Sequence, residues 1–446
     1  MLQKANIVGP GKLKKAMRAV ANFLVAAICG LTFGFTALGY FITMVSGPVV
    51  GARDFVVYWA TGQQLAHHAN PYDREMLLHM ERAAGLPDKY GPMFMRNPPP
   101  TLLLAYPLGF MPLRIASIVW SVVLLLCLVG SVRILWLMHG RRKGIRHWLA
   151  YTFAPALVCL LNGQLSLFAL LGLVVFLRLH RTHPFLAGIS LWLCTMKPHL
   201  FLPFGLVMLI WIVITKSYRI VGGAVLAIGL SFAISWHIDP QAWSQYSRMV
   251  HTSGIQTEFI PCIAVLLRSW ISPGSVWLGY VPAALACIWS AWYFWTRRAE
   301  WNWNTHGSLL MLVSIVAAPY SWLFDQALAI PALLQGAYRT RSRNLVILLA
   351  LLSAFVEVAM LCNVWKSSAV YLWTLWAAPA WVIWYLMATH TESLIATWAS
   401  WTARWKPSDS VAQGDFSQQA GAGDQKPLAG PIDLEAVPAG TEGHSG

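Results

Sequence analysis

Long apolar runs separated by short polar turns make up most of this 446-residue chain. The first run covers about residues 20–45 and the second about residues 113–138, and each is long enough for a membrane-spanning helix, which takes about 20 apolar residues. Ten further runs lie near residues 148–161, 165–179, 184–196, 199–214, 220–236, 276–296, 306–318, 321–337, 344–363 and 368–388. The pattern predicts an all-α, polytopic integral membrane protein of about twelve transmembrane helices, although several runs are short for a complete crossing.

The polar stretches between these runs predict the domain organisation. We expect three parts, at residues 1–19, 20–390 and 391–446. The last part is rich in Gly, Pro, Ser, Ala and Gln from Lys406 onward, so we expect a largely disordered tail. Two long loops interrupt the middle part, an amphipathic one at 46–100 and another at 237–273. Within the second loop, the stretch Pro261 to Trp270 predicts a re-entrant or interfacial helix.

Composition agrees with a membrane protein and argues against nucleic acid as a partner. Hydrophobic residues make up 57% of the chain and charged residues only 11%, whereas soluble domains have roughly 45–50% and about 25%. The formal net charge is +15, but the basic residues lie in short clusters between apolar runs, where they act as topology signals. The 24 Trp suit the membrane–water interface, and the seven Cys are scattered without a CxxC pair.

The distribution of basic residues predicts the orientation of the chain. Of the 32 Lys and Arg, 18 lie in segments that share one side of the membrane if the chain crosses at every apolar run. Those segments are 1–19, 139–147, 178–183, 215–219, 297–305 and 339–343. The first loop, on the opposite side, has five basic and five acidic residues. We therefore expect a multi-pass protein of the cytoplasmic membrane with both termini in the cytoplasm, and the first run is too long for a cleavable signal peptide.

Chemically distinctive residues gather at the turns on the non-cytoplasmic side. They are Asp54, Asn97-Pro98-Pro99-Pro100, Asn162-Gly163-Gln164, Lys197-Pro198-His199, Pro319-Tyr320-Ser321-Trp322 and the nearby Asp325. Any single turn has a plain explanation, because turns ordinarily collect Asn, Gly and Pro, but the cytoplasmic turns are mainly plain Arg and Lys loops. The one-sided distribution indicates a shared site on the outer face.

Two roles for Asp54 are compatible with the sequence. It precedes a short amphipathic run that stops at Asn70-Pro71, so it suits the N-cap of an interfacial helix. Alternatively, a carboxylate at the mouth of an apolar cleft can act as a general base that takes a proton from a substrate hydroxyl. The i,i+4 spacing places Tyr58 on the same helical face as Asp54.

Two cations, Lys197 and Arg268, lie in apolar surroundings near the expected outer surface. Such charges are costly in lipid, so they either extend to the headgroups or face a cavity. In a cavity they would form a phosphate clamp for an anionic lipid, with His199 and Gln164 as hydrogen-bond donors.

Other features leave alternatives open. Asp325 and Glu357 lie well inside apolar runs, where pairing with a cation and a functional role both fit. The proline run at 97–100 cannot continue a helix, and with Arg96 it either stiffens the chain or lines a cleft. No HExxH, Walker A, GxGxxG or CxxC motif is present, and the outer loops lack Asp-x-Asp, so we expect a reaction without a metal or cofactor.

Taken in order, these motifs resemble those of glycosyltransferase family 87, over about residues 18–390. The motifs are Asp-x-x-x-Tyr (54–58), Asn-Pro-Tyr (70–72), Asn-Pro-Pro-Pro (97–100), Asn-Gly-Gln (162–164), Lys-Pro (197–198) and Pro-Tyr-Ser-Trp (319–322) followed by Asp325. The resemblance implies a GT-C architecture and an inverting, metal-independent transfer of a sugar, commonly mannose, on the outer face of the membrane. The donor would be a polyprenyl-phosphate sugar, and the acceptor a hydroxyl of a glycan or glycolipid.

The resemblance also implies that Asp54 is the catalytic base. The predicted phosphate- and substrate-binding residues are Tyr58, Asn97, Asn162, Gln164, Lys197, His199, Arg268, Tyr320, Trp322 and Asp325. No metal ligand is expected. Some mannosyltransferase members have histidines after the Ser-Trp dipeptide, where this chain has Leu323, Phe324 and Asp325, so the sugar or the acceptor can differ from theirs.

Three other classes of protein fit the composition. A transporter or lipid flippase would have its polar residues near the middle of the bilayer, often in related halves, whereas here they gather at one face. A ligase that moves whole oligosaccharides would need a much larger outer loop. A non-catalytic assembly subunit stays open as the third alternative.

Overall fold

The computed structural model describes residues 10–46, 53–86, 88, 91, 93–142, 144–254, 258–363 and 374–404. These residues form helices joined by turns, with no β-strand among them, as the apolar pattern predicts. Six helical stretches in this part of the chain are long and apolar enough to cross a membrane: Gly11–Phe41, Leu113–Met138, Pro198–Thr215, Tyr218–Ile238, Val276–Glu300 and Arg343–Met360. The predicted disordered tail from Lys406 onward lies outside the described residues.

Long α-helices form the main part of each of these stretches. They are α1 (Pro10–Ser46), α5 (Leu113–Met138), α10 (Leu202–Thr215), α11 (Tyr218–Ile238), α14 (Val281–Arg297) and α17 (Arg343–Asn363). Large apolar side chains such as Phe23 on α1, Leu126 on α5 and Trp292 on α14 are each more than half exposed. Extended apolar surfaces on helices of this length identify a membrane protein, because lipid can cover them.

The other apolar runs form shorter or broken helices. They are α6 (Trp148–Tyr151), α7 (Ala154–Asn162), α8 (Ser166–Leu179), α9 (Pro184–Ser190), α15 (Ser308–Ala317) and α16 (Ile330–Arg339). The 14 residues of α8 span about 21 Å at 1.5 Å each, which is less than the ~30 Å of the hydrocarbon core. Most side chains of α8 are buried inside the protein. Twelve complete crossings are therefore not confirmed, since part of the hydrophobicity reflects packing against other helices.

The remaining helices belong to the second long loop and to the end of the chain. The loop contains α12 (Ala242–Thr252) and α13 (Ile263–Ile271), and α13 matches the helix predicted for Pro261 to Trp270. The last helix is α18 (Ala377–Arg404). The chain divides into two compact units, residues 1–391 and 392–446, and the site described below lies in the first.

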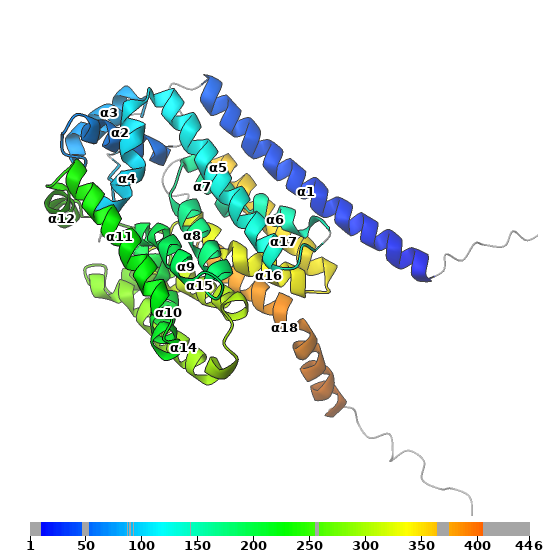
Figure 1. Ribbon diagram of the computed structural model, residues 1–446. Helices are drawn as coiled ribbons and strands as arrows, with labels where there is room; N and C mark the ends of the chain where they lie inside the picture. The colour runs from blue at the N-terminus through cyan, green and yellow to red at the C-terminus, as the bar shows by residue number, and fades with distance from the viewer. Residues whose placement is uncertain are drawn as a thin grey trace, which may run out of the picture. The chain divides into compact units, whose positions relative to one another are not determined.

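The first long loop and the residues that follow it up to Phe110 form short helices that pack against one another (Figure 1). They are α2 (Arg53–Ala66), α3 (Arg74–Ala83) and α4 (Leu102–Ala105), followed by the 3-10 helix Tyr106–Phe110. The backbone of α2 touches the α4 region directly, because a Cβ added to Gly62 would lie 2.2 Å from the carbonyl oxygen of Ala105. This close packing fixes the position of α2.

The proline run, which cannot continue a helix, starts one in the structure. Pro98 is extended, with ψ 160°, but Pro99 starts a 3-10 helix that ends at Thr101. The fixed φ of proline also suits the first positions of a helix, where its missing N–H is not needed. Ser235 of α11 donates a hydrogen bond to the carbonyl oxygen of Pro99 at 2.9 Å, which ties this turn to the end of α11.

Candidate active site

Lys197 lies at a break between two 3-10 helices. The break follows from Pro198, since a proline disfavours the helical conformation of the residue before it. Lys197 is only 7% exposed, and its Nζ donates three hydrogen bonds, to Asp325 Oδ1 at 2.6 Å, Gln164 Oε1 at 3.0 Å and Ser166 Oγ at 3.1 Å. An ammonium group has three N–H donors, so every donor of Lys197 is already used.

Asp325 is the acidic partner of this pair and is 1% exposed. Its Oδ1 accepts from Lys197 and from the hydroxyl of Ser166 at 2.6 Å, and its Oδ2 accepts from the backbone N–H of Trp322 at 2.9 Å. The pairing with a cation that the sequence allows for Asp325 is therefore the arrangement observed. Removing one member of a buried pair leaves an uncompensated charge and costs about 3–5 kcal/mol.

Tyr58 and Asn97 of the first long loop complete this cluster. The Tyr58 hydroxyl, on α2, donates to Gln164 Oε1 at 3.3 Å and lies 3.5 Å from Asn97 Oδ1. Asn97 donates through Nδ2 to the carbonyl oxygen of Met196, next to Lys197, at 3.0 Å. Predicted site residues from separate turns thus meet in one polar cluster, which we define as Tyr58, Asn97, Gln164, Ser166, Lys197 and Asp325.

The glycine of the Asn-Gly-Gln turn makes this meeting possible. Gly163 ends α7 in a left-handed conformation, with φ +69°, which glycine adopts without strain. It lies so close to α2 that an added Cβ would be 2.7 Å from the Cβ of Phe55. Trp120 of α5 donates through Nε1 to the carbonyl oxygen of Gly163 at 2.7 Å, and its ring centre lies 5.4 Å from that of Tyr58. The turn, α2 and α5 therefore hold one another in place.

Asp54 is half-buried in the first turn of α2, four residues before Tyr58. Because α2 begins at Arg53, Asp54 lies inside the helix and not at the predicted N-cap position. A carboxylate in this turn is stabilised by the positive end of the helix dipole. Burial, followed by the charge of Asp54, raises the pKa of Tyr58 well above its usual value, so Tyr58 remains a neutral hydrogen-bond donor. Asp54 therefore lies one helical turn from Tyr58, a member of the polar cluster.

His199 and Tyr320 lie stacked beside the cluster, with ring centroids 3.7 Å apart and planes inclined by 23°. The Nε2 atom of His199 is buried and has no hydrogen-bond partner among the described residues. Burial, more than any neighbouring charge, raises the pKa of Tyr320. The pair is therefore a flat aromatic stack with an unused ring nitrogen.

Three predicted site residues have side chains with other surroundings. Arg268 of α13 is buried and donates to the carbonyl oxygen of Glu258 at 3.2 Å. The Trp322 ring packs on a small apolar group that includes Cys262. Asn162 is the half-buried last residue of α7, and no hydrogen bond of its side chain occurs in the described part of the chain.

Two residues of the site region escape the sequence-based prediction, namely Ser166 and Glu258. Ser166 bonds both members of the Lys197–Asp325 pair. The Glu258 carboxylate lies 2.5 Å from Nη2 of Arg96. A signal exists for Glu258, because the second outer loop contains only one other acid, Asp239. Ser166 has no such signal, since serine is common at the start of a helix.

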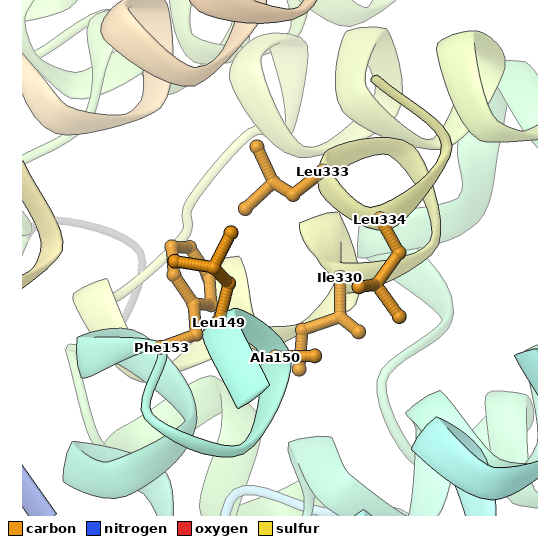
Figure 2. Close-up of a pocket in the computed structure, with 6 residues that line it drawn as sticks. All are labelled: Leu149, Ala150, Phe153, Ile330, Leu333 and Leu334. Carbon is orange, nitrogen blue, oxygen red and sulfur yellow. The ribbon is translucent and has the colours of Figure 1, made fainter. Parts of the chain in front are cut away.

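A separate apolar gap lies between α6 and α16 and shares no residue with the polar cluster. Its lining side chains are Leu149, Ala150, Phe153, Ile330, Leu333 and Leu334 (Figure 2). None of these side chains can bind a phosphate or a hydroxyl, so we take the polar cluster as the candidate active site. Among the described residues, no three His, Cys, Asp or Glu side chains lie close enough together to hold a metal ion.

Comparison with known proteins gives one match. The model of glycosyltransferase family 87 matches residues 94–319, just over half of the chain. No curated protein and no solved structure matches this chain. The matched range includes Asn97, Gln164 and Lys197 of the polar cluster, whereas Asp54 lies before it and Asp325 after it.

Proposed function

The chain belongs to glycosyltransferase family 87, and we propose that it transfers mannose from a polyprenyl-phosphate carrier to a hydroxyl of a glycan or glycolipid. We propose the outer face of the cytoplasmic membrane as the place of this reaction. A donor that is already anchored in the membrane suits a chain made of apolar helices. Such a donor also needs no nucleotide-binding fold outside the cell.

In this proposal Asp54 is the general base. Its carboxylate takes the proton of the acceptor hydroxyl while the hydroxyl oxygen forms a bond to the anomeric carbon of the donor sugar. The bond between that carbon and the phosphate oxygen breaks, and the polyprenyl phosphate leaves with the electron pair. Attack on the face opposite the leaving group inverts the configuration at the anomeric carbon. The first-turn position favours the ionised carboxylate that this role requires.

One observation carries the proposal. Asp54 lies one helical turn from Tyr58, and Tyr58 belongs to a polar cluster whose residues come from distant segments. Buried charges and hydrogen-bonding groups inside an apolar bundle are costly, and such positions are usually functional. The cluster brings hydrogen-bonding groups close to a half-buried carboxylate, as acceptor activation next to a leaving phosphate requires.

We further propose that the reaction needs no metal ion or cofactor. The outer loops contain no Asp-x-Asp motif to hold a divalent cation between phosphate and carboxylate. Fixed donors and cations of the protein would instead stabilise the leaving phosphate. Measuring turnover with and without a chelator such as EDTA tests this part of the proposal directly.

The experiment that tests the function uses the purified protein, Asp54→Asn and a panel of radiolabelled polyprenyl-phosphate sugars. We expect wild-type protein to transfer mannose, and Asp54→Asn to lose activity by at least about 100-fold, the usual contribution of a general base. Asp73→Asn is the matched control. Asp73 caps α3 in the same loop by accepting hydrogen bonds from the N–H groups of Glu75 and Met76, a role that asparagine can also fill.

Two results would contradict the proposal. Near-normal turnover by Asp54→Asn, at equal expression and folding, would remove Asp54 from the role of base. Failure of the wild-type protein to use any polyprenyl-phosphate sugar, while another sugar donor is turned over, would refute the donor class.

A further inference from the structure

Arg96 directly precedes Asn97 of the polar cluster. Of its two terminal nitrogens, Nη1 and Nη2, only Nη2 has a partner in the described part of the chain. Its Nη2 lies 2.5 Å from a carboxylate oxygen of Glu258. Its Nη1 is buried and has no hydrogen-bond partner among the residues that the structure describes. A guanidinium group presents its N–H donors in a fixed fork that matches a carboxylate or a phosphate. Arg96 therefore has an unused donor that faces away from bulk solvent.

Arg96 adjoins the polar cluster through Asn97, whose Oδ1 lies 3.5 Å from the Tyr58 hydroxyl. His199, which stacks on Tyr320, contributes a second buried nitrogen, Nε2, that lacks a partner among the described residues. Two unpartnered nitrogen atoms, Arg96 Nη1 and His199 Nε2, on segments that contribute to the candidate site are what an anionic group of a substrate would need.

Lys197 and Arg96 have different kinds of partner, and this difference suits them to different roles. Lys197 uses all three of its N–H donors, and releasing it would leave Asp325, which is 1% exposed, as an unpaired buried charge. The partner of Arg96 is different, because the side chain of Glu258 is 39% exposed and can return to water. Arg96 can therefore exchange its carboxylate partner at little cost, whereas Lys197 cannot.

We propose that Arg96 binds the phosphate of the lipid-linked sugar donor, and that the Glu258 carboxylate occupies this place until the phosphate displaces it. The inference rests on the proposed function and deepens it by naming the residue that binds the donor phosphate. The exchange breaks the ion pair between Arg96 and Glu258 and forms one between Arg96 and the phosphate. Since Glu258 belongs to the second long loop and Arg96 to the first, donor binding also breaks this one contact between the loops, whereas the packing of Tyr72 against Tyr246 remains.

The test measures KM for polyprenyl-phosphate mannose in three variants, and the two single variants have opposite expected signs. Arg96→Gln removes the charged donor, so we expect KM for the donor to rise about 10- to 100-fold, with KM for the acceptor unchanged. Glu258→Gln removes the competing carboxylate, so we expect KM for the donor to fall. The charge-swapped variant Arg96→Glu with Glu258→Arg restores an ion pair but not the phosphate ligand, so we expect it to stay impaired.

Arg82→Gln is the matched control, because the partly buried Arg82 forms an ion pair with the fully exposed Asp88 in the same loop at 3.2 Å. We expect its KM for the donor to equal that of the wild type. Recovery of wild-type KM in the charge-swapped variant would mean that the ion pair is only structural and would overturn the proposal. An unchanged or raised KM in Glu258→Gln would also overturn it, even if Arg96→Gln failed to fold. In both cases wild-type turnover would leave the proposed function intact, whereas the absence of wild-type turnover with this donor would refute that function itself.

Discussion

At the scale of single residues, the pairing of Lys197 with Asp325 determines what each charge can do. The two side chains are 9% and 1% exposed, so water contributes little to either charge. A pair in this position is stable only while both members are present, because each is the main compensation for the other. The pair therefore holds the turn at Lys197 against the segment around Asp325, next to the proposed base.

We expect Lys197→Met to destabilise the protein by about 3–5 kcal/mol, because it leaves the Asp325 carboxylate charged and buried. The double variant Lys197→Met with Asp325→Asn should recover most of this loss, since asparagine removes the charge and can still accept the hydrogen bond from Ser166. Chemical unfolding in detergent, followed by tryptophan fluorescence, measures both effects. Arg82→Met, which breaks a pair with the fully exposed Asp88 and two hydrogen bonds to backbone carbonyl oxygens, should cost less, because Asp88 stays solvated. A double variant as unstable as the single one would show that the charge is not the cause.

The sequence identifies the members of this pair but not their partnership. Lys197 and Asp325 are conspicuous because charges are rare in apolar runs, and that rarity is visible in one sequence. They are 128 positions apart, however, and no local pattern indicates which cation meets which acid. The same limit applies to Arg268, whose hydrogen bond to the carbonyl oxygen of Glu258 no local pattern predicts. Rarity identifies candidate residues, whereas tertiary packing decides their neighbours.

At the scale of helices, the existence of most elements is predictable and their lengths are less so. Residues 113–138 are predicted as one span and form α5 with the same ends. The run 148–161 instead breaks into α6 and α7, and the run 184–196 changes from α-helix to 3-10 helix at Leu191. Hydrophobicity cannot distinguish a helix that faces lipid from one that packs inside the protein, because both environments select the same side chains.

A glycine prediction belongs to this scale, because Gly163 lets the turn after α7 approach α2. Gly163→Ala combines the strain of a positive φ with a contact of 2.7 Å to the Cβ of Phe55, so we expect losses of about 1–2 and about 1–3 kcal/mol, respectively. Gly140→Ala is the matched control, since Gly140 has φ +75° but no atom within 4 Å of an added Cβ. The difference in unfolding free energy between the two variants measures the close approach alone.

Transfer activity provides a second readout of the same variant. Movement of α2 away from the turn would separate Tyr58 from Gln164 and shift Asp54, so we expect Gly163→Ala to lose activity and Gly140→Ala to keep it. Equal stability and equal activity of the two variants would mean that α2 can move without consequence, contrary to the packing described.

At the scale of the whole molecule, hydrogen bonds between segments constrain how the chain crosses the membrane. Asn97 bonds the carbonyl oxygen of Met196, and Ser235 bonds that of Pro99, so these four residues share one side. If only the six long helices crossed, residues 97–99 would lie on the side opposite Met196 and the end of α11. The contacts therefore favour additional crossings by the shorter helices between α5 and α10.

Cysteine labelling tests this topology, and Lys216 is the informative position because the two alternatives put it on opposite sides. With crossings at every apolar run, the exposed turn at Lys216 is cytoplasmic, whereas with six crossings it is outside. We expect Lys216→Cys to resist a membrane-impermeant maleimide on intact cells and to react after permeabilisation. Asp88→Cys, in the first outer loop, should react on intact cells and provides the positive control, with wild-type protein as the background for native cysteines. Labelling of Lys216→Cys on intact cells would overturn the predicted orientation of half the chain and, with it, an active site assembled on the outer face.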